Sequence, residues 1–61
     1  MFIEFHDPNP IMINVDKIQG FWYDENYERT CIAMIDDYEF QVTESYQEVI
    51  DRITKALSYE Y

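Results

Sequence analysis

The spacing of apolar residues changes once along this chain, at Ser45, and this change constrains the fold more than any other feature. Before Ser45 the apolar residues form short segments with a period close to two, which is typical of β-strands. After Ser45 they recur at the spacing of one face of an α-helix. The sequence therefore predicts several strands followed by one C-terminal helix. The helical stripe consists of Val49, Ile50, Ile53, Ala56 and Leu57.

The start of this helix is marked by the segment SYQE, residues 45–48. It fits a capping box, in which the Ser45 hydroxyl accepts a hydrogen bond from the amide of Glu48 and the Glu48 side chain reaches back. Acidic residues come early in the segment and basic residues late, as the helix dipole prefers. We expect the helix at about residues 46–57.

The segments before Ser45 predict four or five antiparallel strands. In FIEFH, Ile3 and Phe5 share one face, and DPNP then forms a four-residue hairpin loop because proline interrupts strand pairing. Residues 30–35, TCIAMI, are apolar on both faces, which indicates a central strand. Gly20 suits a bend or a close backbone approach. The expected strands are residues 2–6, 11–15, 18–23, 30–35 and 38–43.

These elements predict an α+β fold, an antiparallel β-meander with the C-terminal helix packed on one face of the sheet. A single helix cannot cover both faces. The uncovered face should therefore expose apolar side chains, including Phe2 and Met12. Because an exposed apolar patch usually marks an interface, this fold favours self-association.

The short chain also favours association. A single domain of 61 residues buries only about 60% of the surface of its unfolded form, so it is marginally stable alone. Small domains gain stability from disulfides, metals or oligomers. Cys31 is the only cysteine and His6 the only histidine, so neither an internal disulfide nor a four-ligand zinc site is expected.

The charge narrows the class of partner. Thirteen acidic and four basic residues give a net charge of −9, which repels nucleic acid and anionic membranes. We expect the partner to be a second copy or a protein with a basic surface, although the charge alone can serve solubility. The chain has neither an apolar run of about 20 residues nor a secretory signal pattern, so we expect a soluble, cytoplasmic protein.

The acidic pair Asp36–Asp37 is better explained as a turn than as a catalytic dyad. Neighbouring strand residues point to opposite faces, and a two-residue hairpin loop requires a positive φ that aspartate tolerates. His6 has no nucleophile or second ligand in its motif, and Cys31 lies in an apolar run where a buried, inert thiol is expected. The loop at residues 24–28 lacks the glycine and the length of a calcium-binding loop. We therefore predict no enzymatic activity, metal or cofactor.

The aromatic segment FWY supplies the expected contact residues, because tryptophan and tyrosine are enriched at interface hot spots. These residues are Phe21, Trp22, Tyr23 and, second to them, Tyr27.

Two alternatives stay open. In the first, carboxylates on one face imitate a nucleic acid and inhibit a nucleic-acid-binding protein, as small phage proteins do. That face would consist of Asp24, Glu25, Glu28, Asp36, Asp37 and Glu39 if the two loops lie near each other. In the second, aromatic pockets at a subunit interface bind a small molecule, and an anionic ligand would need Arg29, Arg52 or Lys17.

The segments INVDKI (13–18) and YEFQVTESYQEVIDRI (38–53) resemble the small FlbD-like proteins. The resemblance covers most of residues 2–54 and includes a comparable V-x-E-S-x-x-E-V transition into the helix. It implies a short β-meander with a final helix and an association with flagella. In that family glycine normally completes the hairpin turns, whereas DPNP and Asp36–Asp37 stand there in this chain.

Overall fold

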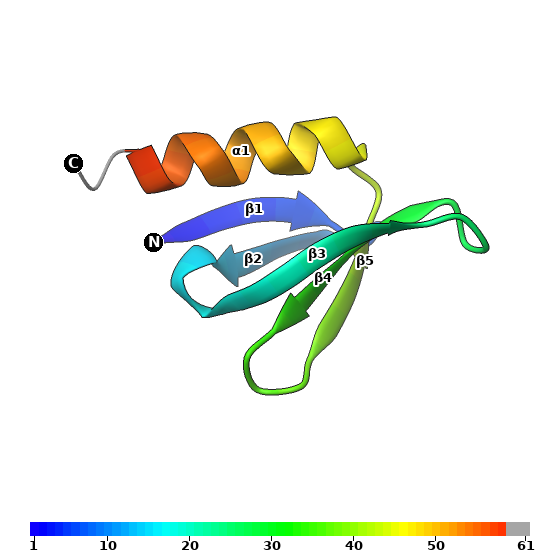
Figure 1. Ribbon diagram of the computed structural model, residues 1–61, viewed down its shortest axis with the longest axis horizontal. Helices are drawn as coiled ribbons and strands as arrows, with labels where there is room; N and C mark the ends of the chain where they lie inside the picture. The colour runs from blue at the N-terminus through cyan, green and yellow to red at the C-terminus, as the bar shows by residue number, and fades with distance from the viewer. Residues whose placement is uncertain (59–61) are drawn as a thin grey trace.

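The computed structural model describes residues 1–58 and has an α+β architecture (Figure 1). A short 3-10 helix, η1, separates the second strand from the third, and the helix α1 lies above the strands. The elements are β1 (Phe2–His6), β2 (Pro10–Asn14), η1 (Val15–Lys17), β3 (Ile18–Asp24), β4 (Arg29–Met34), β5 (Glu39–Val42) and α1 (Tyr46–Ser58).

The strands form two antiparallel sheets. β1 pairs with β2, and β3, β4 and β5 form a second sheet with β4 in the centre. The expected single meander is therefore interrupted between β2 and β3. At this point Asn14 caps η1 by accepting a hydrogen bond from the amide of Asp16, and the amide of Val15 donates to the carbonyl of Met1. The chain turns here, and the two strands do not pair.

The first hairpin has a shorter loop than DPNP predicts. His6 pairs with Pro10, so the loop contains only Asp7–Asn9, and β2 begins one residue earlier than expected. A proline fits here because its missing amide leaves no donor to satisfy at the start of a strand. The faces are as expected: Phe5 and Ile13 are buried on the inner side.

The central position of β4 explains why its residues are apolar on both faces. Cys31 and Ile32 point to opposite sides of the sheet, and both are fully buried. β3 has a bulge between Ile18 and Gly20 in its pairing with β4. The expected close backbone approach at Gly20 is absent: a Cβ at this position would meet nothing within 4 Å.

The turn between β4 and β5 contains three residues, Ile35–Asp37, and not the expected two-residue loop. The amide of Met34 donates to Tyr38, the amide of Asp37 donates to Met34, and only Asp37 has a positive φ, 70°. A three-residue hairpin loop of this kind needs one left-handed residue at its third position. Asp36 therefore needs no unusual backbone conformation.

The C-terminal helix is confirmed, with half of the expected capping box. The Ser45 hydroxyl accepts from the amide of Glu48 at 3.1 Å, but the Glu48 carboxylate lies 3.7 Å from Arg52 instead of reaching back. Val49 and Ile53 are buried on the inner face of α1, and Leu57 is exposed.

Both sheets and the helix enclose one core. The sequence predicted that the helix packs on one face of a single sheet. Instead, α1 contacts β1, β4 and η1, and so it packs against both sheets. At one corner the amide of Thr43 donates to the carbonyl of His6 at 2.7 Å and joins the two sheets. The core residues are Phe5, Ile13, Val15, Ile32, Met34, Val42, Val49, Ile53 and Ala56.

The left-handed residue in the β4–β5 turn gives a stability prediction. Glycine adopts a positive φ without steric cost, so Asp37→Gly should raise the free energy of unfolding by about 0.5–1 kcal/mol. Asp36→Gly is the matched control, since Asp36 has an ordinary φ and the added backbone freedom should only destabilise. Urea unfolding measures both. Equal destabilisation by the two substitutions would contradict this account of the turn.

Candidate interaction surface

β3 places its three consecutive aromatic residues on two faces. Phe21 lies opposite Ile32 and packs against the core, and its ring centroid is 5.8 Å from that of Tyr46 on α1. Trp22 lies opposite Cys31, on the outer face of the sheet, and is 42% exposed. Tyr23 returns to the inner side near the end of the strand and is 48% exposed. One strand thus presents aromatic surface on both faces.

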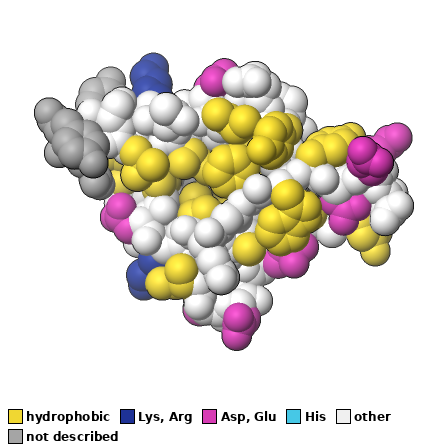
Figure 2. Space-filling view, in the orientation of Figure 1, with side chains coloured by type: hydrophobic (Ala, Val, Ile, Leu, Met, Phe, Trp, Pro, Cys, Tyr) yellow, Lys and Arg dark blue, Asp and Glu magenta, His cyan; other side chains and the backbone are white. Residues whose placement is uncertain are grey.

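Tyr27 extends this surface into the β3–β4 turn, where it is 65% exposed. The turn is ordered by Asp24, whose carboxylate accepts from the amides of Asn26 and Tyr27 at 2.9 and 3.3 Å. Figure 2 shows hydrophobic side chains over β3 and between β3 and α1, with acidic side chains beyond them at the hairpin tip. The four expected contact residues therefore belong to one hairpin, on different sides of it.

The outer face beside Trp22 contains a buried thiol. Cys31 lies between Trp22 and Gln41 on the neighbouring strands and is fully buried. Burial raises the pKa of the Cys31 thiol, and the nearby carboxylates of Glu39 and Asp24 raise it further. The thiol is therefore protonated at neutral pH and is a poor nucleophile.

The proposed acidic face is not formed. Its six residues come from the β3–β4 turn and from the β4–β5 turn with the start of β5, and these two turns lie at opposite ends of β4 (Figure 1). Six strand residues span about 20 Å, so the two groups are well separated. An antiparallel meander places consecutive turns at opposite ends of the strand between them, so the two loops could not have been neighbours in the expected fold either.

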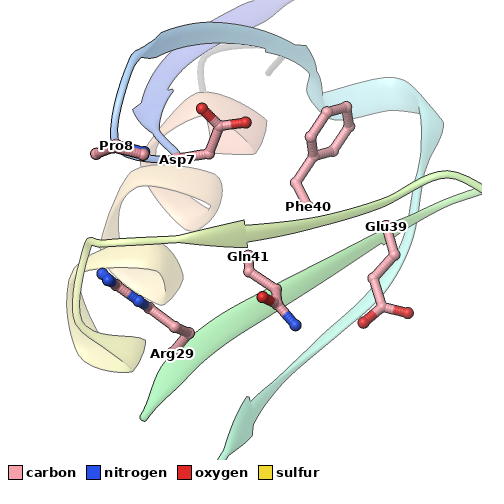
Figure 3. A pocket seen from close by; sticks show the side chains of 6 residues that line it. All are labelled: Asp7, Pro8, Arg29, Glu39, Phe40 and Gln41. Atoms are coloured by element: carbon pink, nitrogen blue, oxygen red, sulfur yellow. The ribbon is translucent and has the colours of Figure 1, made fainter. Parts of the chain in front are cut away.

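A hollow of about 400 Å³ lies beside β5 (Figure 3). Phe40 points to one side of the strand, and Glu39 and Gln41 point to the other, so the hollow follows a strand edge. Arg29 adds the single positive charge of its lining, and the aromatic residues of β3 do not contribute. Its lining residues are Asp7, Pro8, Arg29, Glu39, Phe40 and Gln41.

Sequence reasoning missed the best-ordered polar cluster, which is centred on Glu44. The side chain of Glu44 is only 5% exposed, and its two oxygens lie 3.0 Å from the amide and 2.8 Å from Nδ1 of His6. Arg52 approaches the same carboxylate at 3.8 Å and donates to the carbonyl of Glu4 at 2.8 Å. The buried Thr30 hydroxyl donates to the Glu44 carbonyl.

This cluster is structural. It connects β1 to the segment before α1 and to the helix itself, and the Arg52 guanidinium also lies over the Phe5 ring, 5.7 Å from its centroid. Desolvation by burial would raise the pKa of Glu44, but the hydrogen bonds from the His6 ring and amide and the His6 charge outweigh it, so the pKa is lowered. His6 is thus engaged by a buried carboxylate, and no substrate is needed to explain its position.

Within residues 1–58, no three His, Cys, Asp or Glu side chains are grouped so that they could hold a metal ion. No helix in the same residues is long and apolar enough to cross a membrane.

Comparisons with protein-family models, with curated proteins and with solved structures give no match for this chain. The resemblance to the FlbD-like proteins therefore stays a prediction, and the surface is interpreted from its own residues.

The Glu44 cluster predicts a specific pH dependence of stability. Glu44→Gln should lower the free energy of unfolding by about 1–3 kcal/mol near pH 7, because a partly buried charged hydrogen bond is lost. The folded-state pKa lies below the ordinary value of 4.5, so the contribution is present above pH 4.5 and is lost as the pH falls through the folded-state pKa. The difference between wild type and variant should therefore shrink below pH 4.5.

Urea unfolding at several pH values measures this difference. Glu48→Gln is the control, since Glu48 is exposed and also faces Arg52. A Glu44→Gln difference that stays constant with pH would contradict the assignment.

Proposed function

We propose that this protein is a small, non-enzymatic interaction module that self-associates through its three-stranded sheet, with β3 at the contact. The single observation that carries the proposal is that Trp22 and Tyr23 are both about half exposed, on opposite faces of one strand. Exposed aromatic side chains favour an interface, since their burial stabilises association strongly.

The remaining chemistry supports a binding role rather than catalysis. The only cysteine is buried and its pKa is raised, and the only histidine is held by Glu44. The free, buried thiol also suits a reducing compartment, which supports our proposal of a cytoplasmic protein.

A second copy is our preferred partner, and a protein with a basic surface is the other class that the charge favours. Mimicry of a nucleic acid is less well supported, because its six candidate acids are divided between the two ends of β4. A small-molecule site is also less well supported, since the hollow beside β5 contains one aromatic residue and none from β3.

The proposal predicts that the protein sediments above the monomer mass and that association strengthens with salt. Each copy carries a net charge of −9, and raising the ionic strength from about 0.01 to 0.15 M shortens the screening length from about 30 to 8 Å. Sedimentation equilibrium across this range measures the effect. A monomer at every salt concentration would contradict self-association, and binding to a basic protein that weakens with salt would favour the other partner class.

Trp22→Ala should shift the same equilibrium toward the monomer, by about tenfold or more in the dissociation constant. Met12→Ala is the control, because Met12 is also an exposed apolar residue, at 59%, but lies on the other sheet. If both substitutions have the same effect, or neither has any, β3 is not the contact.

A further inference from the structure

β3 is an edge strand of the three-stranded sheet and pairs only with β4. The amide of Met34 donates to the carbonyl of Tyr38, just before β5. Because hydrogen-bonding groups alternate sides along a strand, the backbone groups of Gly20 and Trp22 point toward β4, and those of Phe21 and Tyr23 point away from it. Neither β2 nor α1 pairs with this side in the described residues. Two N–H and two C=O groups are therefore available for another strand.

The other edges of the two sheets are closed or shorter. On β1 the carbonyl of Glu4 is taken by Arg52, and His6 is bound by Glu44 and Thr43. β2 begins with a proline, and β5 has only four residues and ends at the bond from Thr43. Native proteins usually protect long edges with lysine, proline or a β-bulge. The seven residues of β3 contain no lysine or proline, and the bulge of β3 lies at one end, between Ile18 and Gly20.

We propose that β3 pairs with β3 of a second copy, antiparallel, about a two-fold axis at Phe21. This inference rests on the proposed self-association and specifies how it is built. With Phe21 on the axis, Gly20 of one copy lies opposite Trp22 of the other, so the regular part of β3 pairs and the bulge between Ile18 and Gly20 lies at the end of the ladder. The two three-stranded sheets then become one six-stranded sheet.

Two features that have no evident role within the monomer fit this register. Trp22 lies opposite Gly20 of the second copy, on the outer face, where a Cβ at Gly20 would meet nothing within 4 Å. An aromatic ring from a neighbouring strand commonly covers a bare glycine backbone in this way.

The second feature is charge. One residue before β3 stands Lys17, and one residue after it stands Glu25. Both residues lie outside the strand, Lys17 at the end of η1 and Glu25 in the β3–β4 turn. In this register the Lys17 and Glu25 side chains come near each other at each end of the paired strands, which gives two opposite-charge contacts in spite of the net charge of −9. Because a strand that complements itself under a two-fold axis gives a closed dimer, the occupant is a second copy rather than a different protein.

Cysteine cross-linking tests the register. In the proposed pair Gln19 faces Tyr23 of the other copy at a Cα separation of about 5.5 Å, which a disulfide can bridge. An oxidised mixture of Gln19→Cys and Tyr23→Cys proteins should give a covalent dimer. Either variant alone should give none, because identical positions lie about 13 Å apart. The buried Cys31 should not react.

The possible results distinguish self-association from the specific pairing of β3 with β3. A cross-link from one variant alone would overturn this register. Dimers in sedimentation without a cross-link in the mixture would overturn edge pairing and leave self-association standing. Monomers in sedimentation would overturn both.

A charge exchange tests the same register without cysteines. Lys17→Glu or Glu25→Lys should weaken dimerisation about five- to tenfold, and the double exchange, which keeps the wild-type net charge, should restore it. Lys55→Glu on α1 is the control for net charge, since it changes the charge as Lys17→Glu does but lies far from β3 in the sequence and lines the groove between α1 and β1. Failure of the double exchange to restore dimerisation would contradict the Lys17–Glu25 contact.

Discussion

The interruption of the strand ladder at η1 is the constraint on which the rest of the structure depends. Asn14 caps this short turn, and the bond from Val15 to Met1 fixes its start, so the chain leaves β2 without pairing to β3. Because the two sheets separate here, both can face one core, and α1 can close that core against β1, β4 and η1. The same interruption leaves the edge of β3 free. The separation of the two sheets, which lets both face the small core, therefore also creates the strand edge that we assign to association.

The acidity and the aromatic surface are connected through this arrangement. The acidic residues of the hairpin loops lie at the two ends of the three-stranded sheet, and the exposed aromatic residues lie along β3 (Figures 1 and 2). Charge at the ends keeps an apolar strand from unspecific edge pairing, since like charges repel in most registers. The register that we propose opposes this repulsion because it brings Lys17 near Glu25. On this view the charge selects the partner and the aromatic residues supply the affinity.

The elements that depend on local sequence patterns could be predicted from the sequence. The change of period at Ser45 predicted α1, the two-sided apolar run predicted the central strand β4, and alternation predicted the inner residues of β1 and β2. The division into two sheets could not be predicted, because it depends on whether β2 or the core lies beside β3. The Glu44–His6 contact joins residues 38 positions apart, so no local pattern reveals it, and its only signal was a carboxylate placed between the buried Val42 and the helix cap. The Asp36–Asp37 pair was correctly read as a turn but with one residue too few. The exposure of Trp22 depends on which face of β3 meets the core, and only the fold decides this.

The central claim is that the edge of β3 is covered by a second copy, and amide hydrogen exchange measured by NMR at low and high protein concentration tests it most directly. The amides of Phe21 and Tyr23 point away from β4, so in the monomer they should exchange fast, and in the dimer they become ladder donors. The account predicts that these two amides become protected as the concentration rises, while those of Glu39 and Gln41 on the edge of β5 stay fast. Exchange of Phe21 and Tyr23 that does not depend on concentration, in a sample that sedimentation shows to be dimeric, would contradict it.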